Sequence, residues 1–164
     1  MQTLQLENSE FLFQVCELIK EGHSVSIRAR GNSMRPFVES GRDIAVLTHA
    51  DNFSVGDVVL AEITPGHYVL HRIASIEGDK VILRGDGNPY GTERCTVSDL
   101  KAIASQFIRK GVTWNLQKSW FWKTYSKVWV ALVPIRKYLL ALYRLLWLGE
   151  IPTRLKRLFG CGRQ

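Results

Sequence analysis

Residues 58–89 read VVLAEITPGHYVLHRIASIEGDKVILRGDGNP. Short runs of β-branched and other apolar residues alternate here with turn formers such as Pro65-Gly66 and Gly78-Asp79. Apolar runs of this length, bounded by Gly, Pro and Asp, are typical of strands joined by tight turns. We therefore expect strands over residues 58–63, 68–76 and 80–83, the last two forming a hairpin.

The β pattern extends beyond this stretch in both directions. Val25, Ile27 and Ala29 alternate with polar residues, which predicts a half-buried strand, and further apolar runs cover residues 44–47 and 102–108. Many short strands at this spacing predict a mainly β fold, either a small barrel or a sandwich. Ahead of the strands, apolar residues at helical spacing between Asn8 and Gly22 predict an amphipathic N-terminal helix.

The C-terminal part of the chain has a different character. Up to Gln117 there are 12 Lys and Arg against 14 Asp and Glu, but from Lys118 onward there are 10 against 1. Apolar and basic residues occupy opposite arcs of a helix in this tail, and Pro134 predicts a break that gives two helices. We therefore expect a β domain with its N-terminal helix over residues 1–113 and a basic amphipathic helical tail over residues 114–164.

Several classes of protein are disfavoured by features that the sequence lacks. The three cysteines, Cys16, Cys95 and Cys161, are odd in number and widely spaced, which favours reduced thiols over a disulfide framework or a structural zinc site. We expect no secretory leader at the N-terminus and no membrane-spanning helix, because basic residues interrupt the longest apolar stretch. We also expect no cofactor and no metal.

Ser33 is a candidate nucleophile. It lies in Gly31-Asn32-Ser33-Met34-Arg35-Pro36, directly after the first expected strand. Gly31 permits a sharp turn that holds a hydroxyl away from the backbone, and the N–H groups of such a turn can bind an oxyanion. The alternative is that Ser33 is an ordinary turn residue.

Two further residues can complete a hydrolytic site. His71 lies within an expected strand, where a neutral imidazole can accept the proton of a serine hydroxyl; the alternative is a partly buried histidine with a hydrogen-bonded ring. Asp86 follows the next strand in a Gly-rich turn. It either orients the imidazole as the third member of a triad or caps its own turn, and the sequence favours neither interpretation.

These three segments, in this order, resemble the superfamily that joins type I signal peptidases with the self-cleaving, LexA-like SOS repressors. The resemblance covers residues 24–111 and rests on three short boxes. The family's nucleophile box is matched by Ser33-Met34, Pro36, Gly41 and Asp43. His71-Arg72 matches the endoplasmic-reticulum and archaeal type of signal peptidase, in which histidine replaces the catalytic lysine. The third segment, Gly85-Asp86-Gly87-Asn88, is similar to the family's Gly-Asp-Asn box.

The sequence also departs from the family pattern. Arg42 separates Gly41 from Asp43, and Gly31 stands where many signal peptidases have a hydroxyl that helps to bind the oxyanion. We expect neither the N-terminal membrane anchor of signal peptidases nor the helix-turn-helix domain of the repressors.

The resemblance implies a serine endopeptidase with a Ser33-His71 catalytic pair, supported by Asp86. Its substrate would be a peptide or a precursor protein with small residues before the cut. Because the free histidine side chain titrates near pH ~6.5, we expect activity to rise as the pH passes through about 6 to 7.

Two alternatives to a simple peptidase are open. The fold can serve as a peptide-binding module in which Ser33 and His71 are idle, or the basic tail can carry the main function. That tail can lie on an anionic membrane surface, cover the barrel, or touch nucleic acid, which ranks last because the β domain has no basic patch. We favour the membrane surface, since packing alone would not require ten cations, and expect a peripheral protein on the cytoplasmic side of a membrane, with a soluble cytoplasmic protein as the alternative.

Overall fold

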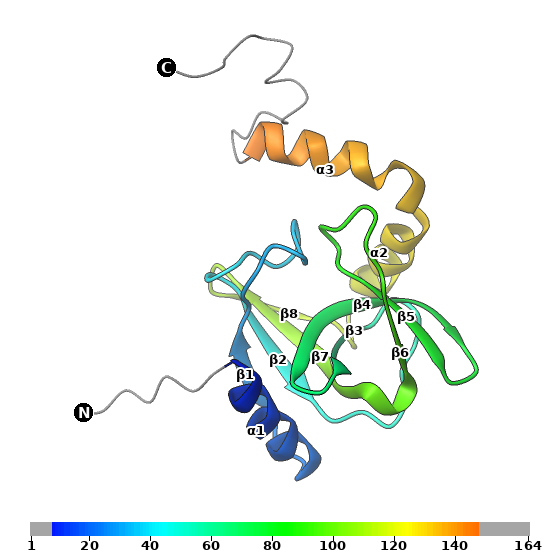
Figure 1. Cartoon of the computed structure of the whole chain (residues 1–164). Coiled ribbons are helices and arrows are strands. Elements are labelled where there is room, and N and C mark those ends of the chain that lie inside the picture. Colours follow the sequence, from blue (N-terminus) through cyan, green and yellow to red (C-terminus); the bar gives the residue numbers. More distant parts are fainter. Residues whose placement is uncertain (1–7, 148–164) are drawn as a thin grey trace, which may run out of the picture.

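The computed structural model describes residues 8–147 and shows one antiparallel sheet with a helix before it and two helices after it (Figure 1). The helix α1 covers Asn8–Lys20. The eight strands are β1 (Val25–Arg28), β2 (Ile44–Thr48), β3 (Val58–Thr64), β4 (His67–Glu77), β5 (Lys80–Arg84), β6 (Glu93–Thr96), β7 (Leu100–Arg109) and β8 (Val112–Asn115). The predicted mainly β class with an N-terminal helix and C-terminal helices is confirmed.

The strands follow the order β1-β2-β7-β3-β4-β5-β6, and β8 also pairs with β7. Consecutive strands β3, β4, β5 and β6 form a meander, in which β4 and β5 make the expected hairpin and β6 is a strand that the sequence did not predict. The long strand β7 pairs with β3 through its first half and with β2 and β8 through its second, so it connects the two parts of the sheet. Its register shifts opposite both β2 and β3, where bulges bend the sheet.

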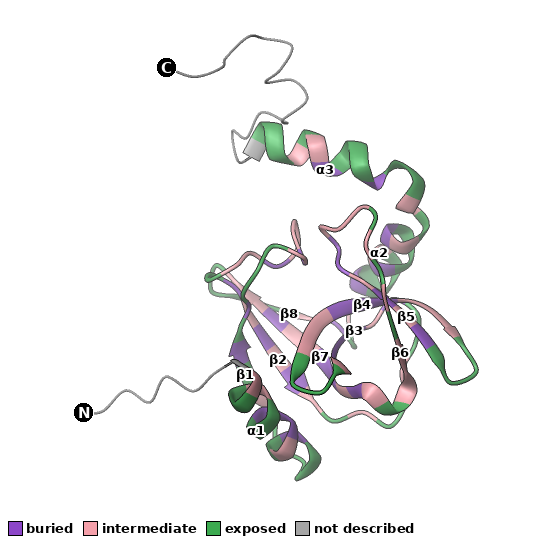
Figure 2. Ribbon diagram, in the orientation of Figure 1, coloured by how far each residue is buried: buried purple, intermediate pink, exposed green. Residues whose placement is uncertain are grey.

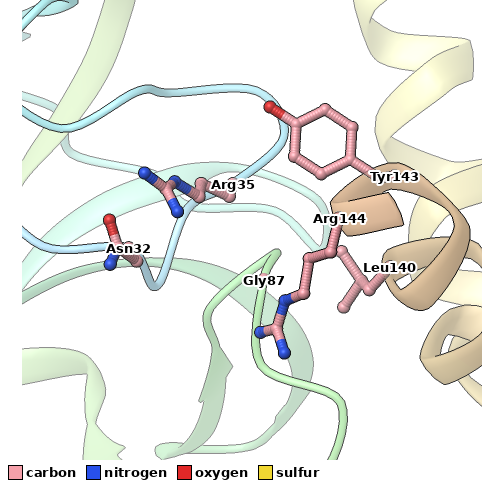
Figure 3. Close-up of a pocket in the computed structure, with 6 residues that line it drawn as sticks. All are labelled: Asn32, Arg35, Gly87, Leu140, Tyr143 and Arg144. Carbon is pink, nitrogen blue, oxygen red and sulfur yellow. The ribbon is translucent and has the colours of Figure 1, made fainter. Parts of the chain in front are cut away.

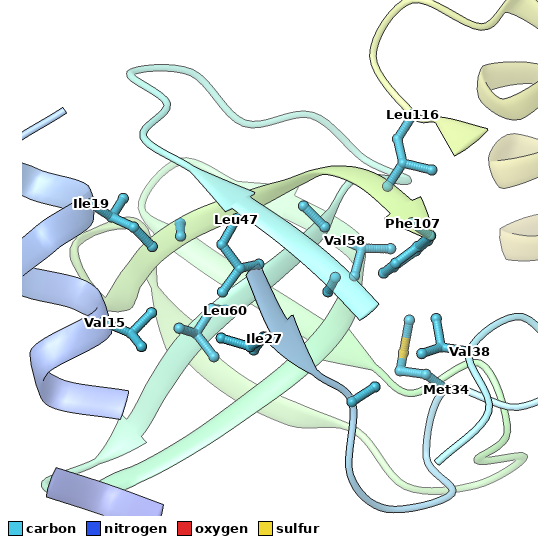
Figure 4. Close-up of a cluster of buried hydrophobic side chains, with 14 of the residues drawn as sticks. Val15, Ile19, Ile27, Met34, Val38, Leu47, Val58, Leu60, Phe107 and Leu116 are labelled. Carbon is cyan, nitrogen blue, oxygen red and sulfur yellow. The ribbon is translucent and has the colours of Figure 1, made fainter. Parts of the chain in front are cut away.

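Two apolar clusters fill the two sides of the bent sheet. The larger one lies between α1, β1, β2, β3 and β7 and includes Leu47, Leu60 and Phe107, all at most 2% exposed (Figure 4). The smaller one gathers Val59, Ile73 and Leu83 from β3, β4 and β5. Successive residues of β3 thus pack in opposite clusters, because the side chains of a strand point alternately to the two faces of its sheet.

Helix α1 packs on the larger cluster with one face, and some of its apolar residues lie outside that face. Val15, Cys16 and Ile19 are almost fully buried, whereas Phe11 and Leu18 are more than two-fifths exposed. Figure 2 shows buried, intermediate and exposed residues mixed along α1. The buried set follows the i, i+1, i+4 spacing of a single helix face. Burial raises the pKa of the Cys16 thiol, which keeps it protonated at neutral pH.

The C-terminal helices are α2 (Trp120–Ala131) and α3 (Val133–Trp147). Ser119 caps α2 by accepting a hydrogen bond from the N–H of Trp122 at 3.2 Å. The break predicted near Pro134 is confirmed, since α2 ends one residue before Leu132 and Pro134 lies in the first turn of α3. None of the helices within residues 8–147 combines the length and the apolar character needed to cross a bilayer.

The expected boundary between residues 113 and 114 can be placed on the secondary structure. It falls inside β8, and Leu116 and Trp122 beyond it belong to the larger apolar cluster. Phe37 contacts the rings of Trp122 and Trp129 at centroid distances of 6.1 and 5.1 Å. The buried aromatic residues of α2 therefore cover the β domain, which is the alternative left open for this part of the tail.

Candidate active site

Ser33 lies in a loop that β1 and β2 hold closed at its base. The N–H of Ala29 donates to the carbonyl of Asp43 at 3.0 Å, and the N–H of Gly41 donates back to the carbonyl of Ala29 at 2.8 Å. Met34 and Val38 are 4% and 1% exposed and fix the loop on the larger apolar cluster (Figure 4). Ser33, between exposed Asn32 and buried Met34, is therefore partly accessible on a rigid base.

The carboxylate of Asp43 organises the far end of this serine loop. It accepts hydrogen bonds from the N–H of Glu39 at 2.8 Å and from Arg42 at 2.6 and 2.8 Å. Burial of the carboxyl acts to raise its pKa, but these hydrogen bonds and the charges of Arg42 and Arg109 outweigh it, so the pKa of Asp43 is lowered. Arg42, which interrupts the expected Gly-Asp pair, thus neutralises a buried charge.

His71 lies in the middle of β4, opposite Val59 of β3, and is 5% exposed. Its Nδ1 lies 2.8 Å from Oε2 of Glu93, the first residue of β6. Because a carboxylate only accepts hydrogen bonds, Nδ1 carries the proton in the neutral ring, and Nε2 is left with its lone pair free. The pairing fixes both the tautomer and the orientation of the ring.

Gly85 is the contact point between Ser33 and His71. A Cβ atom built on Gly85 would lie 3.1 Å from Nε2 of His71 and 3.1 Å from Cβ of Ser33. These two atoms are therefore separated by at most twice that distance, which places the two side chains beside the same glycine. The N–H of Gly87 donates to the carbonyl of Ser33 at 2.7 Å, so the loop after β5 clamps the serine loop in place.

Asp86 does not contact His71. Both of its carboxylate oxygens accept hydrogen bonds from Arg72, at 2.8 and 2.6 Å, and the two side chains are almost completely buried. Arg72 also donates to the carbonyl of Gly56 and to Oγ of Ser126 in α2, both at 2.7 Å. Asp86 is therefore the counter-ion of a buried arginine, and the carboxylate on the imidazole is Glu93, which we did not predict.

The backbone around Ser33 leaves donors available. The N–H of Gly31 donates to Oγ of Ser40 at 3.1 Å, and that of Arg35 donates to the carbonyl of Asn32 at 3.2 Å. Within the part of the chain that the structure describes, the N–H groups of Ser33 and Met34 donate to no protein acceptor. N–H groups beside a nucleophile are the usual donors of an oxyanion hole.

The sequence matches a known family over most of the β domain. The family described as Peptidase S24-like matches residues 2–107, which is well over half of the chain. The matched part includes Ser33, His71, Asp86 and Glu93, and it ends before β8, α2 and α3. A search of the curated proteins finds no match.

Proposed function

The chain belongs to the Peptidase S24-like family, and from this premise we propose that it is a serine endopeptidase with Ser33 as nucleophile and His71 as general base. The observation that carries the proposal is the contact of both residues with Gly85, together with the bond from Nδ1 of His71 to Glu93. A serine, an imidazole and a carboxylate in this sequence of contacts match the roles of a hydrolytic triad.

The proposed reaction uses only groups of this chain and water. Oγ of Ser33 attacks the carbonyl carbon of a peptide bond while Nε2 of His71 takes the hydroxyl proton. The N–H groups of Ser33 and Met34 stabilise the oxyanion, and Glu93 stabilises the charged imidazole. The C–N bond then breaks as His71 returns the proton to the leaving amine, and a water activated by His71 hydrolyses the acyl-enzyme.

Labelling with a fluorophosphonate probe tests the nucleophile directly, because the probe phosphonylates an activated serine. We expect Ser33 to be labelled in the wild type and labelling to be lost in Ser33→Ala and His71→Gln. Ser26→Ala is the matched control, because Ser26 lies on the preceding strand β1 and its side chain is exposed. Cleavage of a peptide library, read by mass spectrometry, gives the second readout.

The same experiment separates a peptidase from an idle binding module. A wild type that neither labels nor cleaves, and so behaves as Ser33→Ala does, contradicts the peptidase and favours a fold that only binds peptides. Labelling that persists in His71→Gln while cleavage is unchanged contradicts His71 as the base and calls for another proton acceptor.

We further propose that α3 seats the protein on an anionic membrane surface. Its outward face carries only apolar and aromatic side chains, each between 36% and 68% exposed: Ile135, Tyr138, Leu139, Leu142, Leu145 and Leu146. These positions follow the i, i+3, i+4, i+7 spacing of one helix face. Residues 118–147 contain no acidic residue, and Lys118, Lys123, Lys127 and Lys137 supply positive charge. Helices of this kind lie in the plane of a lipid interface.

Vesicle sedimentation tests this seating. We expect the full chain to sediment with vesicles that contain about one third anionic lipid and to lose this property in the Leu142→Glu/Leu146→Glu variant. Val112→Glu is the control, because Val112 is an exposed apolar residue of β8 on another part of the surface. Substitution is preferable to truncation, since α2 covers Arg72 and the larger apolar cluster. The proposal would be contradicted if the wild type and the double variant bound vesicles equally and the substitutions instead dissociated a dimer of the wild type.

A further inference from the structure

A cavity of about 120 Å³ opens beside the nucleophile, between the serine loop, the loop after β5 and α3 (Figure 3). It is lined by Asn32, Arg35, Gly87, Leu140, Tyr143 and Arg144. Asn32 directly precedes Ser33, and Gly87 donates a hydrogen bond to the carbonyl of Ser33. The cavity therefore adjoins the loop that carries Ser33, although neither Ser33 nor His71 lines it.

The charges around this cavity are unevenly matched. Arg35 pairs with Glu39 through contacts of 2.8 and 2.5 Å, and the hydroxyl of Tyr143 reaches the other oxygen of Glu39 at 3.5 Å. Arg144 is exposed, and no carboxylate of residues 8–147 lies within ion-pair distance of it. Its guanidinium extends along the wall of the cavity toward Gly87 (Figure 3). Among residues 8–147, the guanidinium of Arg144 is thus the cavity cation that has no carboxylate partner.

We propose that this cavity is a substrate subsite that receives a carboxylate, supplied by an acidic side chain near the scissile bond. The inference rests on the proposed peptidase function and extends it to the class of substrate. Arg binds a carboxylate through parallel N–H donors, and the side-chain amide of Asn32 lines the opposite wall and can add a further donor. A cavity of roughly 150 Å³ can hold benzene, so this one suits a side chain of the size of Asp or Glu.

Arg144 is a specificity residue in this scheme, because it contacts the substrate and not the reacting atoms. It is held by α3, whose Leu140 is 4% exposed and anchors the inner face of the helix. Arg136 of the same helix is 2% exposed and lies over the ring of Trp129 at 4.9 Å. Burial lowers the pKa of Arg136. These contacts position the wall of the cavity independently of the outward apolar face.

The test compares peptides that differ only by Glu or Gln at each position flanking a site cleaved by the wild type. We expect kcat/KM to be roughly 5-fold higher for Glu at one position, as for a solvent-accessible ion pair. Arg144→Glu should remove this preference and favour Lys at the same position. Lys137→Glu is the control, because it makes the same charge change on α3 outside the cavity, and all measurements are made without lipid.

Separate measurements identify the source of the carboxylate and show which of the two proposals fails. Peptides with a free or an amidated C-terminus distinguish a side-chain carboxylate from a terminal one, and discrimination that follows the terminus contradicts the proposal. Fluorescence anisotropy of the same peptides on Ser33→Ala measures binding without catalysis. If the wild type cleaves without a preference for Glu, or if the preference is unchanged in Arg144→Glu, the proposed subsite is wrong but the proposed peptidase function is not affected. If the fluorophosphonate probe does not label the wild type, the proposed peptidase function itself is wrong.

Discussion

The contact at Gly85 predicts a sharp effect of adding a single methyl group. A Cβ atom there would lie 2.5 Å from the carbonyl oxygen of Ser33, a separation that real Cβ atoms essentially never show. Relief of this overlap requires the two loops to separate by roughly 0.5–1 Å. Misplacement of a reacting group by about 1 Å can lower a rate by about 10²-fold, so we expect Gly85→Ala to slow turnover by roughly 10- to 100-fold.

The same substitution also affects stability, and the assay has to separate the two effects. Overpacking of this kind costs about 1–3 kcal/mol in the free energy of unfolding. Gly78→Ala is the matched control: Gly78 has φ +59° in the turn between β4 and β5, with open space around its Cα. The left-handed conformation makes alanine there cost a similar 1–2 kcal/mol without touching the site. The measurements are urea unfolding and the rate at which a fluorophosphonate labels Ser33.

We expect both variants to lose stability and only Gly85→Ala to label slowly. Wild-type labelling in Gly85→Ala would refute the inference that Gly85 sets the approach of Ser33 to His71. An equal loss of labelling in Gly78→Ala would refute it as well, because general loosening of the fold would then explain both.

Three further predictions concern the buried charges. Glu93→Gln should lower the labelling rate of Ser33 by roughly 100-fold, because an amide orients the imidazole and stabilises the imidazolium less than a carboxylate does; an unchanged labelling rate would exclude Glu93 as a positioning residue. Asp86→Ala should lower the free energy of unfolding by about 3–5 kcal/mol, because Arg72 is left buried without its counter-ion, and a loss below 1 kcal/mol in urea unfolding would contradict this role. The pKa of Asp43 is lowered in the folded state. Its contribution to the free energy of unfolding is therefore complete above the pKa of the unfolded chain, near ~4, and is lost as the pH falls through the lower pKa of the folded state. Stability measured between about pH 5 and 2 should therefore fall less steeply in Asp43→Asn than in the wild type, and parallel curves would show that Asp43 does not contribute.

Much of the sheet follows from local sequence patterns. The apolar runs at 44–47, 58–63, 68–76, 80–83 and 102–108 correspond to β2, β3, β4, β5 and β7 within two residues at each end. Strand β6 escapes this reasoning because Glu93–Thr96 contains no apolar alternation and is held by pairing with β5. Strand β8 is short and exposed on most residues, so its sequence gives an equally weak signal.

The site was partly predictable for the same reason. The turn around Ser33 and the position of His71 in a strand are local properties, and both were expected from the sequence. The partner of the imidazole depends on the register of β5 with β6, which pairs Leu83 with Glu93 and which periodicity does not reveal. The two interpretations of Asp86 stayed open because its partner, Arg72, lies on another strand, and local pattern does not show that this arginine is buried, at 1% exposed.

The cavity beside Ser33 takes one wall from α3, beyond the matched residues 2–107, and the other two walls from within them. Under the proposed function, the groups that break the bond and the helix that selects the peptide are therefore encoded in separate stretches of the gene. Exchange of the second stretch, with α2 kept as the cover of Arg72, is a route by which a chain of this kind can acquire new targets without rebuilding its chemistry.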